Sequence, residues 1–151
     1  MEAMLRGLNW KSSLVYLDDV LVFCRTFQDH LLHLQHVFER LRNTGLKLHP
    51  SKCNFAKQKV RYIGHIVNSE GISPDPEKVT AIRTYPTPTN IKQLRAFLGL
   101  SKYYHRFMKN YSKIASPLHQ LTRKFIKFIW TEQCQTAFDE LKESLSQPQI
   151  L

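Results

Sequence analysis

The feature that most constrains the fold is the stretch 14–23, LVYLDDVLVF, in which two runs of β-branched and aromatic residues meet at Asp18 and Asp19. Runs of this composition on either side of a short polar break predict a β-hairpin. A two-residue hairpin turn favours Asn-Gly or Asp-Gly, because these residues tolerate a positive φ, and the Asp-Asp junction contains no glycine. Two adjacent negative charges in such a place indicate a cation bound beside them.

Mg²⁺ is the cation that best fits a pair of carboxylates. It is a hard ion that takes oxygen ligands and keeps water and substrate phosphates in its shell. In two-metal phosphoryl transfer, carboxylates on rigid strands hold ions about 3.5–4 Å apart, which stabilise the attacking and leaving oxygens. The hairpin therefore predicts Asp18 and Asp19 as metal ligands of a nucleotidyl-transfer site. A solvent-exposed acidic turn is the alternative that the hairpin alone leaves open.

The charge balance points to a polyanionic partner. Lysine and arginine number 22 against 12 aspartates and glutamates, which gives a net charge of +10. A surplus of this size is typical of proteins that bind nucleic acid or an acidic membrane surface. The basic residues are spread over the chain after the hairpin, which favours a folded basic surface over a disordered arm. A basic protein without such a partner is the alternative.

The cysteines and the hydropathy bear on the compartment. Cys24, Cys53 and Cys134 lie far apart without a C-x-x-C pair, so neither a zinc site nor a disulfide framework is expected. This usage favours a reducing, intracellular setting. No apolar run has membrane-spanning length, and the first residues lack the basic start and apolar core of a signal peptide. We therefore expect an intracellular protein with no membrane partner.

Capping residues and periodicity predict a mixed α+β chain. Thr26 is expected to cap a helix that runs to Asn43 with an apolar stripe, and Asp75, Asn90 and Thr131 are expected to cap later helices. Strands are predicted over 46–48, 57–67 and 125–130. Gly64 lies inside the second of these, where a glycine often marks a bulge or a place that another backbone or a ligand must approach closely. Prolines cluster from residue 74 onward and place a domain boundary there.

The segment 102–111, KYYHRFMKNY, interleaves aromatic and basic residues. Such a surface can stack bases and neutralise phosphates. The spacing of four residues between Tyr103, Phe107 and Tyr111 is also typical of a helical stripe that faces a core. We therefore predict that these three aromatics pack inward and that phosphate is approached by the basic residues of the segment, Lys102, Arg106 and Lys109.

A series of motifs in the same order identifies a family. The motifs are Tyr16-Leu17-Asp18-Asp19, Gly45-Leu46 with Lys52-Cys53, Tyr62-Ile63-Gly64-His65, Pro86-Thr87-Pro88, the run LRAFLGL at 94–100 and YYHRF at 103–107. Together they resemble the reverse transcriptase of gypsy-class LTR retrotransposons, over essentially the whole chain. Trp130, Cys134, Ala137-Phe138 and Leu141-Lys142 resemble the tract that joins this polymerase to its RNase H domain.

The resemblance implies an α+β fold and three regions. Residues 1–73 would be the C-terminal part of a polymerase palm, made of antiparallel strands and a helix, with the hairpin of Asp18 and Asp19 and a primer-grip hairpin. Residues 74–122 would be the helical thumb. Residues 123–151 would be the connection to an RNase H-like domain and its truncated start.

The resemblance also implies an RNA-directed DNA polymerase, a transferase of deoxynucleotides onto a primer that depends on Mg²⁺ or Mn²⁺. Asp18 and Asp19 would be catalytic and metal-binding, Tyr16 would lie beside the incoming nucleotide and the primer end, and the primer grip would comprise Tyr62, Gly64 and His65. The expected partners are the RNA or DNA template–primer duplex, dNTPs, and the fingers, RNase H and integrase of the Pol polyprotein. The expected location is the cytoplasm, in virus-like particles, or the nucleus.

One departure from the family concerns the metal site. The family uses a third aspartate on an earlier palm strand, whereas the only acid before Asp18 in this chain is Glu2. We therefore expect these 151 residues alone to hold Mg²⁺ weakly, to bind nucleic acid weakly and not to extend primers. The alternative is a non-catalytic nucleic-acid-binding remnant or domesticated protein.

Overall fold

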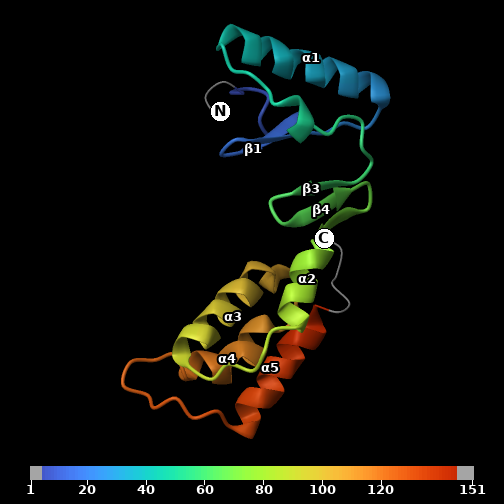
Figure 1. The fold of residues 1–151 in the computed structure, drawn as a ribbon. Helices are drawn as coiled ribbons and strands as arrows, with labels where there is room; N and C mark the ends of the chain where they lie inside the picture. Colours follow the sequence, from blue (N-terminus) through green and yellow to red (C-terminus); the bar gives the residue numbers. More distant parts are fainter. Residues whose placement is uncertain (1–4, 146–151) are drawn as a thin grey trace. The chain divides into compact units, whose positions relative to one another are not determined.

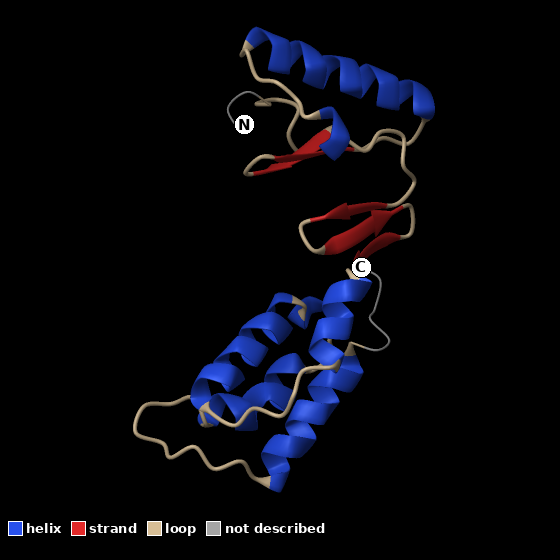
Figure 2. Cartoon of the chain, in the orientation of Figure 1, coloured by secondary structure: helices blue, strands red, loops and turns tan. Residues whose placement is uncertain are grey.

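The structure is a computed structural model that describes residues 5–145 (Figure 1). The chain forms two compact units, Met1–Ile63 and Gly64–Leu151. Both contain short antiparallel strands and helices, so the prediction of an α+β chain is confirmed (Figure 2). Within the described residues, no helix combines the length and apolar composition that crossing a membrane requires.

The first unit contains the predicted hairpin, made of β1 (Ser13–Tyr16) and β2 (Asp19–Val22). The strands are antiparallel, and their register pairs Ser13 with Val22 and Tyr16 with Asp19. The turn is therefore Leu17-Asp18, and the expectation of a turn at Asp18-Asp19 is wrong by one residue. The reason is that Leu17 adopts the positive φ, at 52°, so that Asp19 begins the second strand.

The helix α1 (Phe27–Asn43) packs on this hairpin. It begins as predicted at Thr26, whose side chain accepts a hydrogen bond from the backbone N–H of Asp29 at 3.1 Å. Its buried residues Val37 and Leu41 lie against Leu5 and against the hairpin valines Val15, Val20 and Val22. The hairpin thus has one face supported by a helix, which fixes the direction of its strands.

The predicted strand over 57–67 is interrupted. It is divided into β3 (Val60–Tyr62) and β4 (His65–Asn68), because Ile63 and Gly64 adopt left-handed φ values of 46° and 65°. The strand predicted over 46–48 is wrong, since the chain there is irregular and leads into a 3₁₀ turn, η1 (Pro50–Lys52).

The second unit begins with a hairpin of β4 and β5 (Gly71–Pro74), whose register pairs His65 with Pro74 and Asn68 with Gly71. Four helices follow, with a 3₁₀ turn η2 (His105–Phe107) between the second and the third. They are α2 (Pro76–Arg83), α3 (Ile91–Tyr103), α4 (Tyr111–Gln120) and α5 (Glu132–Ser144). The predicted caps Asp75, Asn90 and Thr131 each accept a backbone N–H two or three residues later.

The four helices share one hydrophobic core. Phe97 of α3 and Phe138 of α5 are 0% and 1% exposed, and their ring centroids lie 4.5 Å apart. Burying a side chain of this size contributes about 1.5–3 kcal/mol. Because α5 supplies Phe138 and Leu141 to this core, the helix itself belongs to the compact unit. The assignment of residues 123–151 as the approach to an RNase H-like region stays a prediction.

The strand predicted over 125–130 is wrong, and the segment is a loop between α4 and α5. Phe125, Ile126 and Ile129 point to solvent, with Phe125 fully exposed. Trp130 instead packs edge-on against Phe138, at 5.8 Å between centroids, and its Nε1 donates to Gln135 Oε1 at 2.8 Å. Among these β-prone residues, Trp130 therefore anchors the start of α5.

Candidate functional site

The two predicted catalytic carboxylates lie at the end of the β1–β2 hairpin. Asp18 is in the turn, Asp19 is the first residue of β2, and both are exposed. Directly paired residues on neighbouring strands have Cβ atoms about 4.5–5.5 Å apart. Since Tyr16 is the partner of Asp19, the register brings Tyr16 and the carboxylates together at one exposed end of the hairpin.

The turn that carries Asp18 is strained. Leu17 adopts φ 52° and is 73% exposed, so no burial of its side chain compensates for the left-handed backbone. A non-glycine residue in this region costs of order 1–3 kcal/mol and persists where the surrounding structure imposes it. The ladder of β1 and β2 imposes it here, and strain of this kind is frequent at functional sites.

Tyr62, at the end of β3, lies within electrostatic range of the carboxylates. Burial raises the pKa of its phenol, and the negative charge of Asp19 raises this pKa further. The effect of Asp19 requires that the two side chains be close within the first unit. The charge of Asp19 thus acts on the phenol of Tyr62 within this unit.

The donor chemistry of this neighbourhood fits Mg²⁺ in part. Two adjacent carboxylates supply the hard oxygen ligands that this ion prefers. In residues 5–145, however, no group of three or more histidines, cysteines, aspartates and glutamates comes together in a metal-binding arrangement. Asp18 and Asp19 would therefore supply part of a ligand set.

Gly64 opens the second unit, and a tyrosine lies against it. Its φ is +65°, and a Cβ at this position would lie 3.1 Å from the hydroxyl oxygen of Tyr104. That hydroxyl donates to the carbonyl oxygen of Gly64 at 2.9 Å, and the backbone N–H of Asp75 donates to the same oxygen at 3.2 Å. A side chain therefore approaches Gly64 closely, where the sequence predicted a bulge or the approach of another backbone or a ligand.

His65, the next predicted residue, packs among aromatic rings of the same unit. Its ring centroid lies 5.3 Å from that of Tyr103, 5.7 Å from Tyr104 and 5.5 Å from Phe107. The prediction that Tyr103, Phe107 and Tyr111 all pack inward is wrong for Tyr103, which is 47% exposed, and right for the other two. Tyr104 is buried instead, because α3 ends at Tyr103 and the four-residue spacing does not continue through η2.

The three predicted phosphate-binding residues are exposed. Lys102 is in the last turn of α3, Arg106 is in η2, and Lys109 follows that turn. They occupy the same short segment as the aromatics that contact Gly64 and His65. Their role toward phosphate stays a prediction. The contact of Tyr104 with Gly64 was not predicted from the sequence, because the four-residue spacing pointed to Tyr103 as the buried tyrosine.

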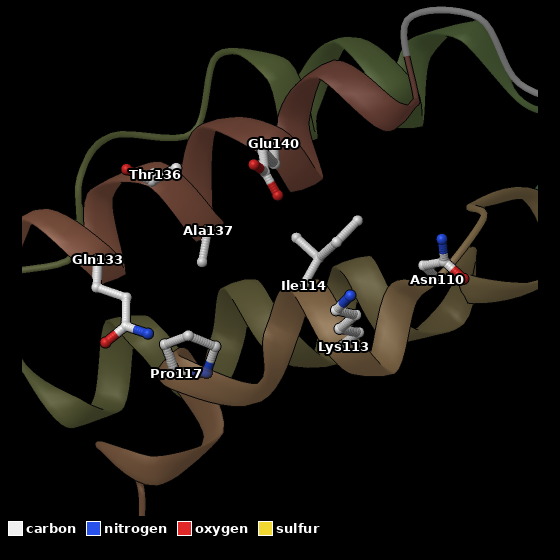
Figure 3. A pocket seen from close by; sticks show the side chains of 8 residues that line it. All are labelled: Asn110, Lys113, Ile114, Pro117, Gln133, Thr136, Ala137 and Glu140. Carbon is white, nitrogen blue, oxygen red and sulfur yellow. The ribbon is translucent and has the colours of Figure 1, made fainter.

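A separate groove of about 560 Å³ runs between α4 and α5. Figure 3 shows Ile114, Pro117 and Ala137 along it, with polar side chains at its edges. None of the residues predicted to take part in catalysis or nucleic-acid binding lines this groove. The groove is therefore not part of the predicted site.

Comparison with known proteins relates the chain to a family. Residues 1–67 match the family model "Reverse transcriptase (RNA-dependent DNA polymerase)". The chain is 43% identical over 153 residues to the retrovirus-related Pol polyprotein from transposon 297 of Drosophila melanogaster, covering 100% of this chain and 14% of that protein. It is 30% identical over 136 residues to the transposon Tf2-3 polyprotein of Schizosaccharomyces pombe, covering 90% of this chain and 10% of that one. The chain thus spans a small part of these relatives.

Solved structures show the same relationship. The foamy viral protease-reverse transcriptase dRH in complex with double-stranded DNA is 25% identical, with a TM-score of 0.89, over 99% of this chain and 26% of that chain. The foamy viral protease-reverse transcriptase in complex with an RNA/DNA hybrid is also 25% identical, with a TM-score of 0.85, over 99% of this chain and 20% of that chain.

Proposed function

Because the chain belongs to the reverse transcriptase region of Pol polyproteins from gypsy-type LTR retrotransposons, we propose that it supplies part of the active site of an RNA-directed DNA polymerase. The observation that carries the proposal is the hairpin register, which presents Asp18, Asp19 and Tyr16 at one exposed end. The reaction would join a dNTP to the 3′ end of a primer on an RNA or DNA template.

In this proposal Asp18 and Asp19 hold Mg²⁺ or Mn²⁺ at the reacting phosphates, and Tyr16 contacts the incoming nucleotide and the primer end. The bound ions supply charge stabilisation to the in-line displacement. The chain's own contribution is positioning, because a paired hairpin supported by α1 holds its side chains in fixed directions. The remaining ligand would be an aspartate from another part of the polyprotein.

The residues after the hairpin would hold the nucleic acid. Tyr62, Gly64 and His65 would grip the primer end, and residues 74–122 would form the thumb. Lys102, Arg106 and Lys109 would approach phosphates of the template–primer duplex, and residues 123–151 would lead toward an RNase H-like region. The relatives that were solved with double-stranded DNA and with an RNA/DNA hybrid support this choice of partner.

Primer extension tests the proposal, in the reverse transcriptase region of the polyprotein that contains this chain with its flanking sequence. Asp18→Asn and Asp19→Asn are expected to reduce extension by about 10³-fold, because each removes a charged ligand. Template–primer binding is expected to remain. Glu70→Gln is the matched control, since Glu70 is an exposed acid in the β4–β5 turn. Unchanged extension in either aspartate variant would contradict the proposal.

A non-catalytic nucleic-acid-binding role is the second candidate, and the exposure of Lys102, Arg106 and Lys109 favours it. The expected signature is salt-sensitive duplex binding that Asp18→Asn and Asp19→Asn leave unchanged, without extension by the unsubstituted protein, since phosphate contacts alone set the salt dependence. Extension that depends on the aspartates would exclude this candidate. The 151-residue chain by itself is expected not to extend primers.

A further inference from the structure

One carbonyl oxygen in the proposed primer grip has two donors from the helical bundle. The oxygen of Gly64 accepts the hydroxyl of Tyr104 at 2.9 Å and the backbone N–H of Asp75 at 3.2 Å. Asp75 is the cap of α2, and Tyr104 follows the last residue of α3. The backbone before β4 is thus tied to two helices of the same unit.

The absence of a side chain at Gly64 permits this contact. A Cβ would lie 3.1 Å from the Tyr104 hydroxyl oxygen and 3.4 Å from Cε1 of Tyr103. The first distance is tighter than most contacts of a real Cβ, the second is at the limit of ordinary van der Waals contact, and the φ of +65° would strain a residue with a side chain. Glycine at this position therefore allows the two tyrosine side chains to come close and allows the backbone to adopt a positive φ.

The Tyr104 ring is held in place by its surroundings. It is 1% exposed, and it packs with His65 and with Phe107, which is also 1% exposed. Burial chiefly, and then the nearby Tyr103 and Asp75, raise the pKa of the Tyr104 phenol to about 12. The hydroxyl therefore stays protonated at physiological pH and remains a donor to Gly64.

A second buried tyrosine shows that this contact is not a general property of the bundle. Tyr111 is 8% exposed, and its hydroxyl lies 3.2 Å from Ser101 Oγ and 3.4 Å from the carbonyl oxygen of Leu98. Its hydrogen bonds are internal to the helices. The rings of Tyr104 and Tyr111 thus belong to one core, but only the hydroxyl of Tyr104 is hydrogen-bonded to Gly64.

We propose that Tyr104 is a positioning residue of the polymerase, whose hydroxyl holds the Gly64 carbonyl and thereby fixes the primer-grip backbone to the helical bundle. The inference rests on the proposed function, because it assumes that Gly64 and His65 contact the primer end. Its consequence is that the primer terminus keeps a constant place relative to the thumb helices. Loss of the hydroxyl would loosen the primer end without weakening the duplex contacts.

The test compares Tyr104→Phe with Tyr111→Phe in the reverse transcriptase region of the polyprotein. Each variant keeps its ring and loses one buried hydroxyl, so a purely structural role predicts equal effects. We expect Tyr104→Phe to lower kcat for nucleotide addition about tenfold, since small displacements of a reacting group are costly. The Kd for template–primer should stay within about twofold, because the phosphate contacts remain. Tyr111→Phe should leave kcat unchanged.

Equal kcat in the two variants would overturn the inference, as would a loss in Tyr104→Phe that appears only in the Kd. Gly64→Ala is the second variant, which displaces the same contact while the tyrosine stays, and it should reproduce the fall in kcat. If Asp18→Asn and Asp19→Asn abolish extension while Tyr104→Phe behaves as Tyr111→Phe, this inference alone fails. If the aspartate variants extend primers normally, the proposed function fails.

Discussion

The two units of the chain differ in predicted function and in packing: the first presents the predicted catalytic carboxylates, and the second has the larger hydrophobic core. In the first, the described residues bury only Leu5, Val37 and Leu41 as a core, while most of the predicted apolar stripe of α1 is solvent-exposed, with Phe27 at 62% and Leu31 at 50%. In the second, residues from α2 to α5 form one extensive core around Phe97 and Phe138. The unit that presents the carboxylates has little packing of its own, and the unit that presents the thumb residues is well packed.

The difference shows that few apolar contacts hold the hairpin in place. A small core stabilises an element only weakly, and local opening is easiest where few apolar contacts exist. Positioning of Asp18 and Asp19 therefore rests on the β1–β2 ladder and on α1. Four predictions test this comparison.

The largest effect is expected in the second unit. Phe138→Ala should lower the free energy of unfolding by about 3–5 kcal/mol, because it opens a cavity at the centre of the core. Denaturant unfolding followed by circular dichroism measures this. Val37→Ala, in the small core of the first unit, is expected to cost less. Equal costs for the two substitutions would contradict the contrast between the units.

Alkaline pH should weaken the second unit through Tyr104. Its pKa is raised from 10.0 to about 12. Below pH 10 both states keep the proton and stability is complete; between pH 10 and about 12 the unfolded chain loses its proton first, so the free energy of unfolding falls. Each unit of pKa difference is worth about 1.4 kcal/mol.

Denaturant unfolding across that pH interval measures the loss. Tyr104→Phe should show a smaller decline than the unsubstituted chain, because its side chain has no proton to lose. Tyr111→Phe is the control, because Tyr111 is a second buried tyrosine of the same unit. Burial raises the pKa of Tyr111 as well, and its hydrogen bond with Ser101 opposes that rise. An unchanged decline in Tyr104→Phe would show that this hydroxyl is not buried against Gly64.

A smaller gain is expected in the hairpin. Leu17→Gly should stabilise β1 and β2 by about 1 kcal/mol, because glycine adopts a positive φ without strain and the leucine side chain is exposed. Hydrogen exchange of the hairpin amides measures the change. Leu17→Ala keeps the strain and should leave exchange unchanged. Faster exchange in the glycine variant would mean that Leu17 is needed for packing.

The smallest effect is expected at Phe125, in the loop before α5. The side chain is fully exposed, so Phe125→Ser should change the free energy of unfolding by less than about 0.5 kcal/mol. The comparison with Phe138→Ala contrasts an exposed and a buried phenylalanine of one unit. A large loss in Phe125→Ser would mean that the loop packs on the bundle.

Local chemistry was predictable from the sequence. Thr26, Asp75, Asn90 and Thr131 cap helices as predicted, because the hydrogen bonds of a cap involve residues two or three positions apart. The hairpin was predictable for the same reason, since two β-prone runs that are separated by a short polar break pair with each other. The α+β class follows from these elements.

Features that depend on tertiary contacts were not predictable. The turn begins at Leu17, which adopts a positive φ although leucine rarely does so, and residue propensities therefore gave no indication of this turn position. The loop at 125–130 has β-prone residues, but its conformation is set by Trp130 packing on Phe138. Tyr104 rather than Tyr103 is buried because α3 ends between them, and helix ends are uncertain in any sequence pattern.

Incorporation of a single dNTP under single-turnover conditions, by the polyprotein's reverse transcriptase region and at increasing Mg²⁺ concentration, is the most direct test of the role of Asp18 and Asp19. For Asp19→Asn we expect a rate about 10³-fold below that of Glu70→Gln on the same template–primer, without loss of duplex binding. Equal rates in the two variants at every Mg²⁺ concentration would contradict the assignment of the carboxylate pair to nucleotidyl transfer.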